Sequence, residues 1–89
     1  MRTFFGFELM QLIVRFSPAS YEAWKSDFDA HSEDRDQSGL TLLQLWRGAD
    51  SANRAVALFE VHDRKAAQGW IDRQQALQGG VEAEFVRTA

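Results

Sequence analysis

The sequence predicts one α+β domain in the order strand, helix, strand, strand, helix, strand, and three observations support this class. The chain has 89 residues, of which 45% are hydrophobic and 26% charged, so it suits a single compact core. Apolar runs of strand length alternate with amphipathic runs of helical period. Glycines separate these runs, at Gly39 and at the pair Gly79 and Gly80.

The first half of the chain predicts one strand and one long helix. Residues 9 to 16 alternate apolar side chains on one face with mixed side chains on the other, as a strand does. Ser17 or Ser20 then supplies an N-cap for a helix that continues to residue 38. Gly39 is a suitable C′ residue to end that helix.

The predicted helix over residues 20 to 38 is amphipathic. Its solvent-facing side carries the acids Glu22, Asp29, Glu33 and Asp36. One opposite arc of the helical wheel holds the residues Tyr21, Trp24, Phe28, His31 and Arg35. We therefore expect this second arc to face the core.

The second half predicts a hairpin, a helix and a closing strand. Residues 40 to 47 and 54 to 62 are nearly continuous apolar runs, joined by a turn-rich segment of hairpin length. Asp63 can cap a helix that runs to about Gln78. Residues 81 to 88 alternate again and predict the last strand.

This order predicts a ferredoxin-like βαββαβ fold, with an antiparallel sheet and two helices on one face. The two central runs, residues 40 to 47 and 54 to 62, offer apolar side chains on both faces. Exposed patches of that size are rare on soluble monomers. We therefore expect a homodimer, a dimeric α/β barrel in which two sheets pack face to face and leave a cavity beside the sheets or beneath the helices.

Composition excludes several classes of function. The chain has no cysteine, which removes disulfides, thiolate metal sites and a cysteine nucleophile, and favours a cytoplasmic location. The apolar run over residues 1 to 10 is short and interrupted by Glu8, so neither export nor a membrane partner is expected. The net charge is −3 with no basic stripe, which argues against nucleic acid.

The segment YEAWKSDFDAHSEDRDQSG (residues 21 to 39) is followed by a strand, a short acidic loop, a second strand and a helix that begins at Asp63. The chain thereby resembles the small, uncharacterised members of the dimeric α+β barrel superfamily, which are related to the antibiotic-biosynthesis monooxygenase-like proteins. The resemblance covers residues 10 to 88. It implies one dimeric barrel domain over residues 10 to 89, preceded by an N-terminal extension, residues 1 to 9.

The resemblance implies no substrate. The first functional hypothesis is a cofactor-independent monooxygenase-like enzyme that acts on a small aromatic or polyketide-like molecule. On that hypothesis His31 moves protons and Arg35 orients an oxyanion. Ligand-binding candidates are the aromatic residues Trp24, Phe28, Trp46 and Trp70. Heme degradation is not implied, because the predicted first strand has no asparagine.

Each candidate residue also has a structural interpretation. His31 can sit at the core edge, bonded to Asp27 or Asp34, and Arg35 can form a salt bridge with Asp27 or with an acid of the partner chain. The aromatic residues at helical spacing can simply be core. Asp27, His31 and Asp34 lie on one helix with no second element, so no metal site is predicted.

The alternative function is a non-catalytic dimer module that binds a small apolar or aromatic molecule or another protein. The superfamily fold alone does not choose between this module and an enzyme, since one fold hosts unrelated activities. No cofactor is predicted under either hypothesis, because the sequence contains no phosphate-binding glycine loop and no HExxH motif.

Overall fold

The computed structural model describes residues 10–89 as four strands and three helices. The predicted extension, residues 1 to 9, lies outside the described residues. In chain order the elements are β1 (Met10–Phe16), α1 (Tyr21–Ala30), α2 (Ser32–Gln37), β2 (Leu40–Arg47), β3 (Ala55–Val61), α3 (Arg64–Leu77) and β4 (Glu82–Arg87). No helix within residues 10–89 has the length and apolar character that a bilayer-spanning helix requires.

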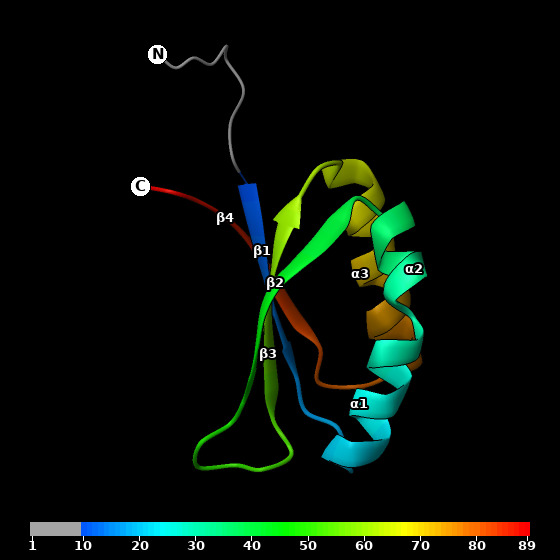
Figure 1. Cartoon of the computed structure of the whole chain (residues 1–89), viewed down its shortest axis with the longest axis vertical. Helices are drawn as coiled ribbons and strands as arrows, with labels where there is room; N and C mark the ends of the chain where they lie inside the picture. Colours follow the sequence, from blue (N-terminus) through cyan, green and yellow to red (C-terminus); the bar gives the residue numbers. More distant parts are fainter. Residues whose placement is uncertain (1–9) are drawn as a thin grey trace.

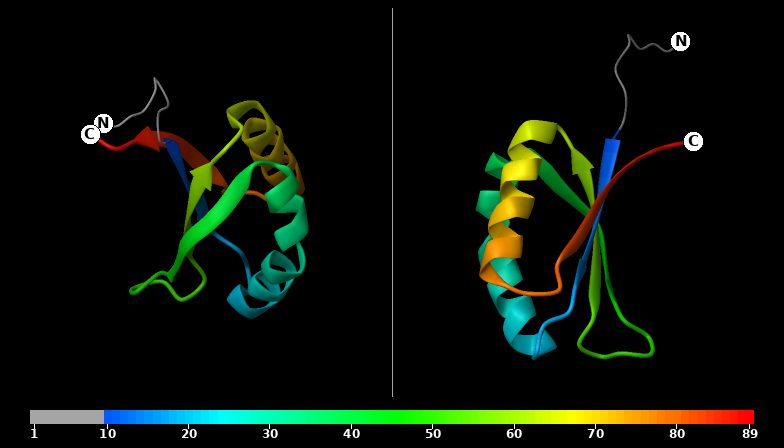
Figure 2. Two further views of the ribbon diagram at one scale, coloured as in Figure 1. Left: turned by 45° about the horizontal axis from the view of Figure 1, so that its top comes forward. Right: turned by 180° about the vertical axis from the view of Figure 1, so that it is seen from behind.

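The four strands form one antiparallel sheet in the order β2-β3-β1-β4. All three helices cover the same face of this sheet, and Figures 1 and 2 show the opposite face without a helix. The α+β class, the antiparallel sheet and the placement of the helices on one face are therefore confirmed. We call the helix-covered side the inner face and the other side the outer face.

The helices begin and end where local chemistry favours it. The Ser20 side chain accepts a hydrogen bond from the backbone N–H of Ala23 at the start of α1, and the Asp63 carboxylate accepts one from Ala66 at the start of α3. Gly39 follows α2 with φ +72°, a conformation that favours glycine. A Cβ at Gly39 would also lie 2.8 Å from the Cβ of Asp63, so no larger residue fits there.

The prediction of one helix over residues 20 to 38 is wrong, and the structure has three helices where two were expected. His31 interrupts the helix between α1 and α2, with φ −108° and ψ 26°. Its backbone N–H bonds to the carbonyl oxygen of Phe28 instead of continuing the α-helical pattern. The break leaves the last carbonyls of α1 in need of other donors.

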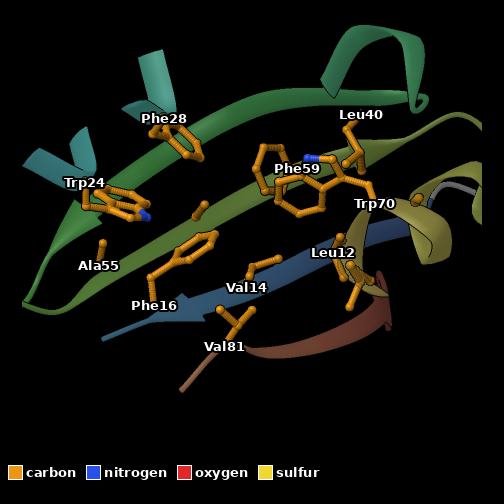
Figure 3. Packing of buried hydrophobic residues seen from close by; sticks show 13 residues of the cluster. Leu12, Val14, Phe16, Trp24, Phe28, Leu40, Ala55, Phe59, Trp70 and Val81 are labelled. Carbon is orange, nitrogen blue, oxygen red and sulfur yellow. The ribbon is translucent and has the colours of Figure 1, made fainter. Parts of the chain in front are cut away.

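The core lies between the inner face and the helices. Figure 3 shows Phe59 and Phe16 of the sheet beneath Trp24, Phe28 and Trp70 of the helices. The buried set also contains the smaller residues Leu12, Val14, Leu40, Ala55, Ala57, Ala67, Ile71 and Val81. Aromatic rings provide much of this volume, and the Phe59 and Trp70 rings meet edge to face with centroids 5.5 Å apart.

The loop between β2 and β3 is tied to the start of α1. The Asn53 side-chain amide donates to the carbonyl oxygen of Ala19 over 3.1 Å, and its oxygen accepts from the backbone N–H of Tyr21 over 3.2 Å. Arg47, at the end of β2, stacks on the Tyr21 ring and bonds to Glu22. The hairpin tip is thus joined to the helix layer by side chains more than 20 residues apart in sequence.

The outer face carries both apolar and polar side chains. The register places Trp46 opposite Val56, and Leu58 opposite Ile13, on this side of the sheet. These four residues, together with Val86 of β4, form what we call the outer apolar patch. Trp46 is 46% exposed, and the other four are half-buried. The apolar character predicted for the second face is therefore present in part, beside polar residues such as Gln44 and Glu60.

Candidate functional site

A cleft of about 120 Å³ opens between α1 and α2 on one side and α3 on the other. The predicted site residues that line it are Trp24, Phe28, His31, Arg35 and Trp70. The structure therefore brings together five of the six candidates. The sixth, Trp46, lies on the outer face across the sheet and takes no part in this cleft.

The aromatic candidates form the floor of the cleft. Trp24 and Phe28 stack with ring centroids 4.8 Å apart and an interplanar angle of 27°, and both are buried. Trp70 is buried from the α3 side. These rings thus belong to the core and present only small parts of their surface to the cleft, which agrees with the structural interpretation of their helical spacing.

Arg35 is the buried charge of this site, at 6% exposure. Its Nη1 donates to the carbonyl oxygen of Phe28 over 2.6 Å, and its guanidinium lies over the Phe28 ring at 3.7 Å. The expected salt bridge to Asp27 is not formed, and no carboxylate among residues 10–89 lies within 4.0 Å of Arg35. The guanidinium therefore replaces a missing helical donor at the C-terminal end of α1.

Burial lowers the pKa of Arg35 from its ordinary value, while the more distant carboxylates of Asp29, Asp36 and Asp34 act in the opposite direction. The direction shows that the loss of hydration outweighs the attraction of these acids. An arginine stays protonated at neutral pH even so. The cleft thus contains a positive charge that has lost part of its hydration. No carboxylate among the described residues contacts this charge directly to compensate for that loss.

His31 lies at the rim of the cleft, where its side chain is 59% exposed. Its Nδ1 is 2.8 Å from the carbonyl oxygen of Asp27, which is one of the carbonyls freed at the helix break. Because a carbonyl oxygen only accepts, Nδ1 carries the proton and Nε2 is the basic nitrogen. The Asp27 carboxylate, one of the two partners that the structural interpretation named, lies 3.5 Å from Nδ1.

The remaining charges in the cleft already have partners. The Asp34 carboxylate accepts from Arg73 of α3 over 3.4 and 3.5 Å, and Arg73 also bonds to Ser38. The Asp27 side chain is 75% exposed and is therefore well hydrated. Asp27, His31 and Asp34 do not form a group able to hold a metal ion within the described part of the chain.

A second, more open hollow of about 560 Å³ continues from the cleft along α1 and α3. The two share five lining residues: Trp24, Asp27, Gln74, Leu77 and Gln78. The hollow adds Pro18, Ala19 and Ala23 from the start of α1. Together they form one groove. Arg35 lies at one end, the segment from Pro18 to Ala23 lies at the other, and Leu77 lies between them because it lines both parts.

Sequence reasoning missed the α3 side of this groove, which consists of Arg73, Gln74 and Leu77. These residues lie three, four and seven positions after Trp70, so they share one helix face with it. That spacing was the available signal. The sequence alone did not show that this face lies across from α1 and α2.

Comparison with known proteins identifies the fold but no family. No family model matches the chain, and no curated protein matches it. A solved structure, the crystal structure of PA3566 from Pseudomonas aeruginosa, is similar with a TM-score of 0.66 and 14% sequence identity, over 92% of this chain and 95% of that one. At this identity the likeness concerns the fold: a small α+β domain with a four-stranded antiparallel sheet.

Proposed function

We propose that the protein is a homodimeric small-ligand-binding module, in which each protomer keeps its own site in the cleft between α1, α2 and α3. The observation that carries this function is the cleft itself. It combines an aromatic floor with a buried guanidinium and an amide, Gln74, and such convergence of apolar and polar groups is typical of ligand sites.

The connectivity supports a ferredoxin-like domain as half of a dimeric barrel. The two strands of each strand-helix-strand unit, β1 with β2 and β3 with β4, are separated in the sheet by one strand of the other unit. This is the split βαβ arrangement. The structural neighbour described above covers nearly the whole domain, in keeping with this proposal for the fold.

The outer apolar patch supports the dimer. Trp46 is nearly half exposed, although tryptophan is among the residues most enriched at protein interfaces. Leu43, beside it on β2, is 49% exposed. A second copy that packed its own outer face here would cover both apolar surfaces by one symmetric contact.

Light scattering of the purified protein tests the dimer. We expect twice the protomer mass for the wild type, whereas Trp46→Glu weakens association at least tenfold, on the order expected for an interface hot spot. Because Trp46 is partly exposed, the variant should keep its dispersed amide spectrum. Leu77→Glu is the matched control, since Leu77 is 79% exposed on the helix side. A wild-type protein that is monomeric at high concentration would exclude the dimer.

The monooxygenase-like activity remains a second hypothesis, and His31 is the residue that tests it. Its basic Nε2 is suited to proton transfer, but the exposed rim gives the ring little shielding from water. We expect His31→Ala to leave ligand binding within about twofold and the melting temperature nearly unchanged. A turnover of an aromatic or polyketide-like substrate that His31→Ala abolishes would favour the enzyme instead.

A cytoplasmic location stays a prediction from the cysteine-free composition. It can be tested together with the oligomeric state by fractionating cells that produce the chain at its natural level. Recovery from a membrane or an exported fraction would overturn it.

A further inference from the structure

We infer that the groove binds a small amphipathic carboxylate, with the anionic head at Arg35 and the apolar body directed toward Leu77. This inference rests on the proposed ligand-binding function and adds the chemical class of the ligand. The residues that carry it line one continuous groove.

Arg35 identifies the head group. A guanidinium has five N–H donors, and within residues 10–89 only one of them is used, in the bond to the Phe28 carbonyl oxygen. No buried side-chain nitrogen or oxygen among the described residues lacks a partner, so the remaining donors of Arg35 keep access to the cleft. Stacking on Phe28 fixes the plane of the group. A planar cation held in this way matches the two oxygens of a carboxylate.

The charges around Arg35 permit an anion. The Asp34 carboxylate is bonded to Arg73, and the Asp27 carboxylate stands beside His31 in water. Both acids are therefore satisfied by other partners or by solvent. A carboxylate in the cleft would replace the hydration that Arg35 loses on burial, which is the condition under which a buried arginine becomes favourable.

The far end of the groove identifies the body of the ligand. This part of the groove is lined by the apolar residues Pro18, Ala19, Ala23, Trp24 and Leu77, with the polar residues Ser20, Asp27, Gln74 and Gln78 beside them. Leu77 is the most exposed large apolar side chain of the described residues. An apolar chain attached to the head group would cover Leu77 and part of the Trp24 ring, and this burial would add to the affinity.

The test uses three ligands of equal chain length but different head group: hexanoate, hexanol and hexylamine. Binding to the whole protein is followed by titration calorimetry and by amide chemical shifts of α1 and α3. We expect hexanoate to bind about tenfold or more tightly than hexanol, because a charge-assisted hydrogen bond is stronger than a neutral one. Hexylamine should bind most weakly.

Two variants distinguish recognition of the ligand's head group from binding of its apolar chain in the groove. Arg35→Met should remove the preference for hexanoate and leave hexanol binding within about twofold. Gln74→Glu places a carboxylate beside the head group with little change in shape, so it should weaken hexanoate about tenfold but not hexanol. Arg54→Met makes the same change of charge in the exposed β2–β3 loop and should change neither affinity. If Arg35→Met fails to fold, Gln74→Glu decides.

The outcomes distinguish the two proposals. The carboxylate assignment would be overturned if hexanol bound as tightly as hexanoate and neither Arg35→Met nor Gln74→Glu changed the affinity. The ligand-binding function would stand in that case. Failure of all three ligands to shift any amide of the groove would overturn both. Shifts confined to the outer apolar patch would also overturn the assignment, because they would place the ligand on the other side of the sheet.

Discussion

Neighbouring residues of β3 lie in opposite environments. Ala55, Ala57 and Phe59 are fully buried beneath the helices, whereas Val56 and Leu58 between them keep part of their surface in water. Both sets are apolar, so the difference comes from what covers each face and not from residue type. Val56 and Leu58 are residue types that usually lie under cover, while residues 10–89 supply a layer over the inner face alone.

Of two adjacent β3 residues, the one on the inner face should affect stability most when it is replaced. Phe59→Ala removes a buried ring that contacts Phe28 and Trp70, and we expect a loss of about 3–5 kcal/mol in the free energy of unfolding. Leu58→Ala, one residue away on the outer face, should cost about 1 kcal/mol in the isolated protomer. Urea unfolding in the Trp46→Glu background measures both.

The same pair also tests the outer face in the wild-type background. There, Leu58→Ala should lower stability by more than it does in the Trp46→Glu background, because it also removes contact area between copies. Phe59→Ala should lower stability equally at all concentrations relative to the wild type. Equal losses for the two variants in both backgrounds would contradict the distinction between the faces.

A smaller loss of stability is expected from a substitution at Asn53, where the hairpin tip joins the helix layer. Asn53→Ala removes both the acceptor for the Tyr21 N–H and the donor to Ala19, which should cost about 1 kcal/mol. Asn53→Asp keeps the acceptor and loses the donor, so about half of that loss should remain. Ser51→Ala in the same loop is the control. Thermal unfolding that does not separate Asn53→Ala from Ser51→Ala would show that the connection has no energetic role.

The strands could be predicted from sequence because alternation and short apolar runs are local signals. The expected strand over residues 40 to 47 coincides with β2, and the expected helix after Asp63 coincides with α3. The break at His31 was missed because a helical wheel treats the whole segment as one continuous helix. A break at a single residue leaves the apolar residues on the same arc of the wheel. The acids Glu33 and Asp34, which follow Ser32 in the first turn of α2, were the available signal for a new helix start.

The site was predictable only in part. Helical spacing correctly grouped Trp24, Phe28, His31 and Arg35, and Trp70 joined them from α3. What Arg35 bonds to could not be predicted, because its acceptor, the Phe28 carbonyl, becomes available only where α1 ends. Trp46 was grouped with the other tryptophans by composition, and composition carries no information about the face of a sheet.

Strand β2 lies at an edge of the sheet and contains an irregularity that limits how the sheet can grow. Its pairing with β3 shifts register between Leu42 and Gln44, which leaves Leu43 as an extra residue on the edge. A further strand laid along this border would meet a kinked ladder and could not bond to it without interruption. The kink thus disfavours the addition of a further strand at the β2 edge of the sheet.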